Sequence, residues 1–270
     1  MSADDVDPSA MFELVIVGGG NMGAALIGGL VDAGVYSGDQ MAVVELRAER
    51  RSELVQLFPT VKVTESVPPC RGAVLAVKPA DTPTAAAAAS GAGADRVLSI
   101  AAGVRLESIE AALGEGVAAL RAMPNTPALV GKGVAALARG TTASDTDVAW
   151  AETILGAVGI VEQLPEPDLD AFTGVAGSGP AYVFLVAEAL VEAAIAEGLA
   201  PSTAERVVCQ LLLGASTLLD RDGDPAQLRA AVTSPGGTTA AGLRVLEEHA
   251  VRAAFGDAVS AATVRSRELG

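Results

Sequence analysis

The chain has 270 residues, half of them hydrophobic, and its 33 acidic residues against 18 basic ones give a net charge of −15. This length and apolar content are sufficient for one large or two medium domains. The acidic charge argues against nucleic-acid binding, which requires a basic face. Cys70 and Cys209 lie far apart and outside any CxxC spacing, and both are expected to be buried thiols. We therefore expect neither a disulfide framework nor a metal site, and we expect a reducing, cytoplasmic location.

Residues 1–11 are expected to form a disordered tail, because they are acidic and lack the basic and apolar segments of a secretory signal. The single histidine, His249, is predicted to be a solvated surface residue, so histidine-dependent hydrolase and hydroxy-acid dehydrogenase chemistry would have only one candidate. The most apolar predicted helix, 181–196, carries Glu188 and Glu192. It is predicted to be a buried helix, and we expect no membrane partner.

Between Phe12 and Leu164, short β-rich runs alternate with helical stretches such as 47–57 and 104–113. This alternation predicts an α/β domain in which a parallel sheet carries helices on its faces. The predicted strands are 14–17, 41–45, 73–77, 97–100, 117–123, 134–138 and 160–164.

A glycine-rich turn follows the first predicted strand directly and opens an amphipathic helix that ends at Gly34. Gly18, Gly20 and Gly23 are in G-x-G-x-x-G register, and the succession of strand, glycines and helix predicts a dinucleotide site. Gly18 permits the tight turn, Gly20 lets the pyrophosphate approach the backbone, and Gly23 lets the helix pack on the strand. The residues expected to contact the cofactor here are Gly18, Gly19, Gly20, Asn21, Met22 and Gly23.

The second predicted strand ends at Glu45, about twenty residues after the glycines, where an acidic residue binds the ribose hydroxyls of NAD and repels the 2′-phosphate of NADP. Arg47, Arg50 and Arg51 follow at once. An arginine there can hold that phosphate, but the three also fit a solvated helix face with neighbouring glutamates. Both interpretations stay open.

Three further strand ends are expected to line the same groove, because ligands bind at the carboxyl edge of such sheets. Val77 and Lys78 follow the third strand, Ala102 follows the fourth, and Asn125 follows the fifth. Lys78 is equally consistent with a functional residue over the groove and with an ordinary surface lysine.

After Pro165 the pattern becomes helical throughout, so we predict a dinucleotide-binding domain at 1–164 and an all-α domain at 165–270. The predicted helices are apolar almost all round and need cover on every side, which favours a homo-oligomer. They are expected at 182–198, 202–219, 226–232, 239–248 and 252–269.

The segment TSPGGTT, residues 233–239, interrupts these helices, because proline and glycine are costly inside a helix. Ser234 or Thr238 can cap a new helix that starts here. Free backbone N–H groups at a helix start, beside glycines that permit close approach, form a receptor for a carboxylate or phosphate. A plain connection between helices is the alternative.

These segments, in this order, resemble the pyrroline-5-carboxylate reductases, which complete proline synthesis. The resemblance extends from about Leu14 to Leu269, and GSGPAY and TSPGGTT at this separation are not general features of dinucleotide-binding folds. It implies an N-terminal Rossmann domain followed by an all-α domain that interlocks with a partner subunit, in dimers or rings of dimers. The segments that carry it are VGGGNMG, AVKP, AAGV, RAMPNTPALVG, DAFTGVAGSGPAYVFLVAEAL and VTSPGGTTAAGLRVLE.

The resemblance also implies site roles. Backbone N–H groups of 234–238 would hold the carboxylate of 1-pyrroline-5-carboxylate, and the Thr239 hydroxyl would contact its ring nitrogen while hydride passes from the nicotinamide C4 to the imine carbon. Thr239 is the catalytic candidate that the resemblance gives, and Lys78 is a second candidate because of its position at a strand end. Asp222 corresponds to an acidic residue near the substrate amine in some members, although the turn RDGDP also accounts for it. The substrate-binding candidates are Ser234, Gly236, Gly237, Thr238, Thr239 and Asp222.

The resemblance gives NADPH as the expected cofactor. NADH is possible, because Val44 and Glu45 occupy a place where members that prefer NADPH often have small hydroxyl residues. Two other functions compete. Another imine or β-hydroxyacid reductase could share this plan, but the second kind carries a lysine in its helical domain and this chain has none after Lys132. A non-catalytic dinucleotide sensor would need no second anion site, which the 233–239 loop provides.

Overall fold

The computed structural model describes residues 11–270, so the tail predicted at 1–11 lies, except for Met11, outside the described residues. The chain forms two compact units. The first, called here the sheet unit, runs to Gly177 and takes in residues 262–270 as well, and the second, the helical unit, is Ser178–Ala261.

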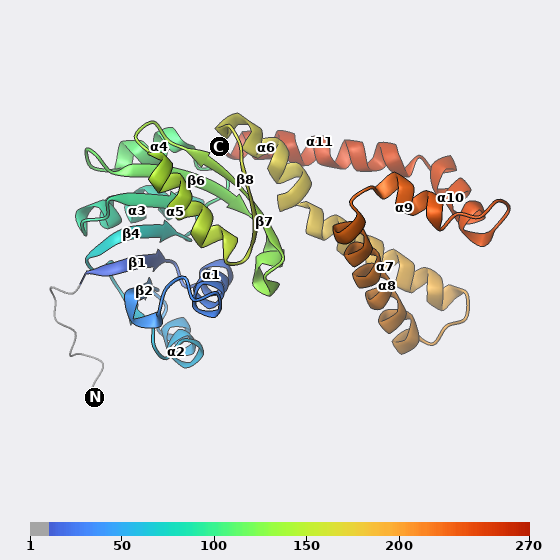
Figure 1. Cartoon of the computed structure of the whole chain (residues 1–270), viewed down its shortest axis with the longest axis horizontal. Coiled ribbons are helices and arrows are strands. Elements are labelled where there is room, and N and C mark those ends of the chain that lie inside the picture. The colour runs from blue at the N-terminus through green and yellow to red at the C-terminus, as the bar shows by residue number, and fades with distance from the viewer. Residues whose placement is uncertain (1–10) are drawn as a thin grey trace. The chain divides into compact units, whose positions relative to one another are not determined.

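The sheet unit contains eight strands in the described part of the chain (Figure 1). They are β1 Phe12–Val17, β2 Met41–Val44, β3 Lys62–Thr64, β4 Cys70–Leu75, β5 Arg96–Ser99, β6 Ala118–Pro124, β7 Gly133–Arg139 and β8 Gly159–Gln163. Its α-helices are α1 Asn21–Asp32, α2 Ala48–Leu57, α3 Thr82–Gly91, α4 Leu106–Ala112, α5 Asp145–Gly156 and α6 Leu169–Phe172, and a π-helical turn, Thr173–Gly177, follows α6.

The strands lie in the order β3-β2-β1-β4-β5-β6-β7-β8, so the chain reverses its direction of travel across the sheet between β1 and β4. All neighbouring strands pair in parallel except β6 and β7. This confirms the predicted α/β Rossmann arrangement. The prediction of a parallel sheet is wrong for one pair, since β7 runs antiparallel to β6. The connection 125–132 is too short for the helical crossover that a parallel pair requires.

Helices cover both faces of the sheet, and each face has its own core (Figure 1). On one face Leu26 of α1, Leu54 of α2 and Ile154 of α5 are fully buried against alternate residues of the central strands. On the other face the small side chains of α3, such as Ala86, allow that helix to lie close to β1 and β4. Because both faces are buried, the central strands are apolar along their length.

The helical unit is built from α7 Gly179–Ala196, α8 Pro201–Asp222, α9 Pro225–Ala231, α10 Thr238–Glu248 and most of α11 Val251–Leu269. Within the described chain only two of its hydrophobic side chains, Ala204 and Val208 of α8, are buried. Phe184 and Leu185 of α7 are 63% and 64% exposed. The expectation that α7 is a buried helix is therefore not met within one chain, and segment 166–196 is long and apolar enough to cross a membrane by length and composition.

The boundary between the two compact units follows Gly177, whereas the predicted domain boundary lies between residues 164 and 165. Residues 165–177 pack with the sheet unit, because Glu166 accepts hydrogen bonds of 2.7 Å from both the Leu106 backbone and the Arg121 side chain. Leu169 is buried in the core beneath α4. Strand β3 was not predicted. The expectation that both cysteines are buried is met for Cys70, whereas Cys209 is exposed within the single chain.

Candidate active site

The glycine-rich turn between β1 and α1 has the close packing that its spacing predicts. Gly18 has a φ of +109°, and a Cβ built on it would collide with the Ala76 carbonyl oxygen of the neighbouring strand end. A Cβ on Gly23 would likewise collide with the Gly18 carbonyl oxygen. At Gly20, by contrast, no atom lies within 4 Å of such a Cβ. Gly18 and Gly23 are thus required by the fold, whereas Gly20 faces open space where a ligand can approach.

Helix α1 starts immediately at this open position. Its N-cap is Gly20, no side chain caps it, and its first turn contains no acidic residue. The first backbone N–H groups of a helix have no partner within the helix, and the helix dipole adds partial positive charge. The turn therefore fits a pyrophosphate held by backbone N–H groups.

A cavity of about 210 Å³ continues from this helix start along the carboxyl edge of the sheet. Met22, Val77 and Ala102 belong to its lining, together with Ile100 and Met123 at the ends of neighbouring strands. Its walls are mostly apolar, and they come from the first turn of α1, the end of β6 and the segments that follow β4 and β5. A flat aromatic ring such as a nicotinamide fits a groove of this kind.

Glu45 lies at the end of β2, next to the glycine turn, and its side chain is 10% exposed. Burial by itself raises the pKa of this carboxyl, but hydrogen bonds from the Arg47 backbone at 2.9 Å and side chain at 3.2 Å outweigh it. The net pKa is lowered, so Glu45 is an anion at neutral pH. Arg50 donates a 2.7 Å hydrogen bond to the Gly19 carbonyl oxygen. One carboxylate and two guanidinium groups therefore surround the place expected for the ribose.

The 233–239 loop lies in the helical unit and forms the start of α10. Gly236 has a φ of +70°, and Gly237 is the N-cap of α10 with no side-chain cap. The Gly237 N–H donates to the Ser234 carbonyl oxygen at 3.0 Å, which closes the turn and leaves the following N–H groups at an uncapped helix start. Thr239 lies in the first turn of the helix and is partly buried. The N–H groups at this helix start are donors that suit a carboxylate, and substrate binding there stays a prediction.

Comparison with known proteins identifies the family in which a dinucleotide groove is combined with a helical unit of this kind. Residues 166–269 match the family model described as pyrroline-5-carboxylate reductase dimerisation, and residues 13–103 match the model described as NADP oxidoreductase, coenzyme F420-dependent. A pyrroline-5-carboxylate reductase of Synechocystis is 41% identical, with 96% of this chain and 98% of the relative covered. The chain belongs to the pyrroline-5-carboxylate reductase family.

Solved structures of the family have the same fold along nearly the whole chain. The pyrroline-5-carboxylate reductase of Coxiella burnetii superposes with a TM-score of 0.88 at 33% identity, and covers 97% of this chain and 99% of its own. The Plasmodium falciparum pyrroline carboxylate reductase, solved with NADP bound, gives 0.82 at 28% identity, with 97% and 100% covered. The fold assignment therefore applies to the sheet unit and the helical unit alike.

Two further sequence-predicted cofactor residues, Asn125 and Lys78, follow β6 and β4. Asn125 is buried, donates to the Ala176 carbonyl oxygen at 3.0 Å, and accepts from the Val134 N–H at 2.9 Å. These bonds tie the π-helical turn to the strand ends, so the amide serves the fold, and its contact with a cofactor stays a prediction. Lys78 is exposed, and in the described part of the chain its ammonium group has no ion pair.

The third weak candidate, Asp222, is the last residue of α8. It is exposed, and its carboxylate accepts hydrogen bonds of 2.7 and 2.8 Å from Arg221. These bonds lower the pKa of the Asp222 carboxyl. Its surroundings fit the turn that ends α8 and give no separate support for a substrate contact.

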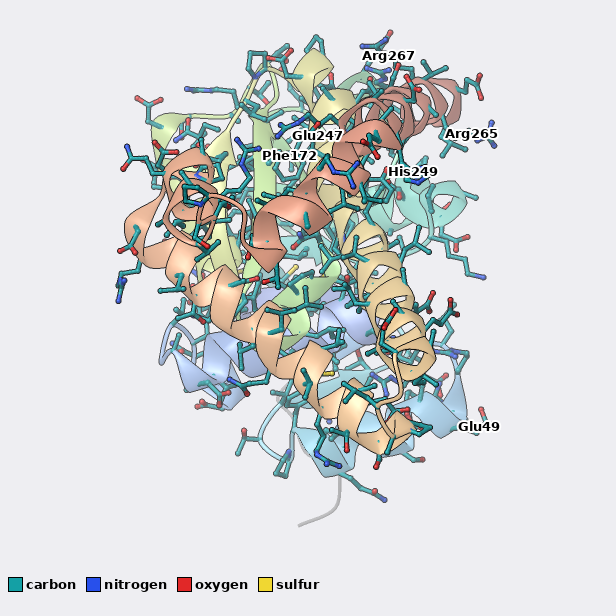
Figure 2. All side chains as sticks on the ribbon, turned by 90° about the vertical axis from the view of Figure 1, so that its right-hand side faces the viewer. Glu49, Phe172, Glu247, His249, Arg265 and Arg267 are labelled. Carbon is teal, nitrogen blue, oxygen red and sulfur yellow. The ribbon has the colours of Figure 1, made fainter. Side chains whose placement is uncertain are left out.

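Sequence reasoning missed Ile100, which lines the cavity, because an apolar residue at a strand end carries no chemical signal of its own. Its position directly after β5, two residues before the predicted Ala102, is the feature that could have found it. His249, predicted to be at the surface, is exposed at the end of α10 (Figure 2).

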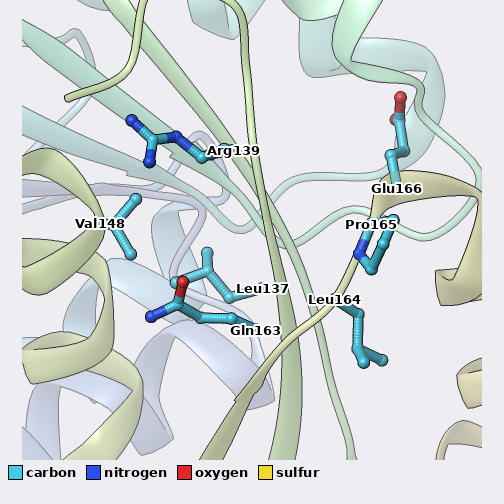
Figure 3. A pocket seen from close by; sticks show the side chains of 7 residues that line it. All are labelled: Leu137, Arg139, Val148, Gln163, Leu164, Pro165 and Glu166. Atoms are coloured by element: carbon cyan, nitrogen blue, oxygen red, sulfur yellow. The ribbon is translucent and has the colours of Figure 1, made fainter. Parts of the chain in front are cut away.

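A second cavity, of about 300 Å³, lies between β7, β8 and α5 (Figure 3). Leu137 and Val148 form an apolar part of its wall, and Arg139 at its rim is bound to Asp145 at 2.8 Å. None of the predicted site residues belongs to this cavity. It is therefore separate from the candidate active site.

Proposed function

We propose that this chain reduces 1-pyrroline-5-carboxylate to L-proline with hydride from NAD(P)H, the last step of proline biosynthesis. The observation that carries the proposal is the similarity to pyrroline-5-carboxylate reductases over nearly the whole chain. A second glycine turn at a helix start, Gly236–Gly237 before α10, agrees with it in a chain that also has a dinucleotide groove. A dinucleotide alone needs one anion site. The second suits a small carboxylate substrate, and membership of this reductase family names that substrate.

The residues of the sheet unit fit the cofactor. The pyrophosphate is held at the start of α1, where Gly20 leaves room, and the nicotinamide lies in the groove beside Val77 and Ala102. When bound, the cofactor supplies a hydride to the imine carbon. NADPH is the expected form, and the solved relative with NADP bound supports it. The Glu45 carboxylate beside the ribose position keeps NADH as a second possibility.

The substrate loop of the helical unit positions the acceptor. Backbone N–H groups of the loop 234–238 bind the substrate carboxylate, apart from the Gly237 N–H that closes the turn. The Thr239 hydroxyl accepts a hydrogen bond from the protonated ring nitrogen. This holds the imine in its iminium form, in which the carbon is most electrophilic. No side chain with a strongly shifted pKa is required, because the rate gain comes from orientation and from stabilised charge.

The helical unit is proposed to form a homodimer, or a ring of dimers, in a cytoplasmic enzyme. Its apolar helices are mostly exposed within one chain, and the dimerisation family model spans them. A partner subunit would bury Phe184, Leu185 and their neighbours, which also accounts for the apolar 166–196 segment without a membrane. The 233–239 loop is proposed to face the nicotinamide groove of the partner subunit, so that the site is complete only in the oligomer.

The test is steady-state kinetics of Thr239→Ala beside Thr239→Ser. Loss of the hydroxyl should lower kcat about tenfold or more, while Ser retains most of it and dinucleotide affinity stays the same. Unchanged turnover in Thr239→Ala would remove Thr239 from the mechanism. Equal losses in both variants would indicate a packing role for the methyl group.

A further inference from the structure

The last turns of α11 belong to the sheet unit and not to the helical unit in which this helix begins. Their buried residues are Thr263 and Ser266, which share one helix face. Arg265 and Arg267 project away from that face into solvent (Figure 2). We call residues 262–270 the C-terminal turn.

A buried hydrogen bond fastens the C-terminal turn to α6. The Ser266 hydroxyl donates to an Asp170 carboxylate oxygen at 2.7 Å, and Asp170 and Ser266 are 4% and 8% exposed. The other Asp170 oxygen accepts from the Arg105 guanidinium at 3.4 Å. A buried carboxylate is tolerated only with such partners. Asp170 therefore links Ser266 to Arg105, at the end of the loop that follows β5.

The chain end also packs directly on that loop, residues 101–105. Gly103 has a φ of +77°, and a Cβ built on it would lie 2.8 Å from the Leu269 carbonyl oxygen. The neighbouring Ala101 and Ala102 line the cofactor cavity on the other side. The loop thus lies between the nicotinamide groove and the end of α11. Figure 1 shows this end of α11 close to α6.

We propose that the C-terminal turn positions loop 101–105 as a wall of the nicotinamide groove. Ser266, Asp170 and Leu269 are then positioning residues for cofactor binding, although none of them touches the cavity. This inference rests on the proposed cofactor site. Its physical basis is preorganisation: a loop held by contacts that exist before the ligand arrives loses little conformational freedom on binding.

The experiment measures the dissociation constant of NADPH by fluorescence titration, together with the melting temperature, without any pyrroline substrate. The variants are a chain that ends at Glu268, so that Leu269 and Gly270 are removed, and Ser266→Ala. Arg267→Ala, on the exposed face of the same turn, is the matched control. We expect both variants to weaken NADPH binding about tenfold while remaining folded at the assay temperature. The melting temperature should stay close to that of the full chain in the shortened chain and fall by a few degrees in Ser266→Ala, which leaves the buried Asp170 short of a donor. The control should change neither quantity.

Gly103→Ala supplies the second arm. In the full chain the methyl group of Ala at position 103 would collide with the Leu269 carbonyl, but in the shortened chain Leu269 is absent. The effects of Gly103→Ala and of the shortening on NADPH affinity should therefore be non-additive. Additive effects, or NADPH affinity within twofold of the full chain in both the shortened chain and Ser266→Ala, would overturn the inference. So would a lower melting temperature with unchanged affinity. Failure of the full chain to bind any dinucleotide would refute the cofactor site itself, whereas normal binding without pyrroline-5-carboxylate reduction would refute only the proposed substrate.

Discussion

Gly20→Ala and Gly23→Ala should separate cofactor binding from folding within one four-residue turn. Gly20 has an ordinary φ of −66° and open space at its Cβ position, so alanine fits the ligand-free fold. At Gly23 a Cβ would collide with the Gly18 carbonyl oxygen, and the backbone must shift to accept it. The two substitutions add the same methyl group, which makes each the control for the other.

The expected magnitudes follow from these surroundings. A methyl group at Gly20 keeps the pyrophosphate from the backbone, and the loss of one charge-assisted hydrogen bond costs about 1.5–3 kcal/mol, or roughly 10- to 150-fold in affinity. Its effect on stability is that of alanine at an N-cap, about 1 kcal/mol or less. At Gly23 overpacking costs about 1–3 kcal/mol of folding free energy, which lowers the melting temperature by about 3 to 10 °C.

Fluorescence titration with NADPH and NADH, paired with thermal unfolding of the same preparations, measures both quantities. We expect Gly20→Ala to weaken binding at a nearly unchanged melting temperature, and Gly23→Ala to lower the melting temperature. Normal dinucleotide affinity in Gly20→Ala would refute the placement of the pyrophosphate at this turn. A fully stable Gly23→Ala would refute the packing argument.

Three further changes test other parts of the molecule. Gly237→Val should raise the KM for 1-pyrroline-5-carboxylate by about tenfold or more while NADPH affinity stays the same, because the side chain covers the uncapped start of α10; a normal KM would rule out this carboxylate site. Glu45→Ser should raise the ratio of kcat/KM for NADPH over NADH about tenfold, because it removes the anion and frees Arg47; an unaltered ratio would place the ribose elsewhere. Burial raises the pKa of the Cys70 thiol to about 11. In a Cys209→Ser variant, where Cys70 is the remaining cysteine, this thiol should react with a disulfide reagent at pH 8 only as fast as the protein opens. Rapid stoichiometric labelling of the native protein would contradict its burial.

Much of the fold could be predicted from the sequence, because local patterns determine it. The glycine register at Gly18, Gly20 and Gly23 follows a strand and opens a helix, and each glycine lies in the surroundings that its position predicts. The glycine pair at Gly236 and Gly237 likewise forms a turn and the start of α10. In both places the backbone conformation depends on neighbouring residues of the chain.

The remaining features depend on contacts between residues far apart in the sequence. The position of Asn125 after a strand predicts a cofactor contact, but it does not reveal that the amide bonds to Val134 and Ala176. The return of residues 262–270 to the sheet unit rests on the pairing of Ser266 with Asp170, which no periodicity reveals. Strand β3 is only three residues long and has no distinctive pattern.

The most direct test of the proposed function is an assay of NADPH and NADH oxidation by the purified chain with 1-pyrroline-5-carboxylate, run beside the six-membered-ring homologue, with L-proline measured in the same samples. The account predicts that the five-membered imine accelerates cofactor oxidation far more than the larger ring, and that one L-proline forms for each reduced cofactor consumed. Oxidation no faster than without substrate, or without formation of proline, would contradict it.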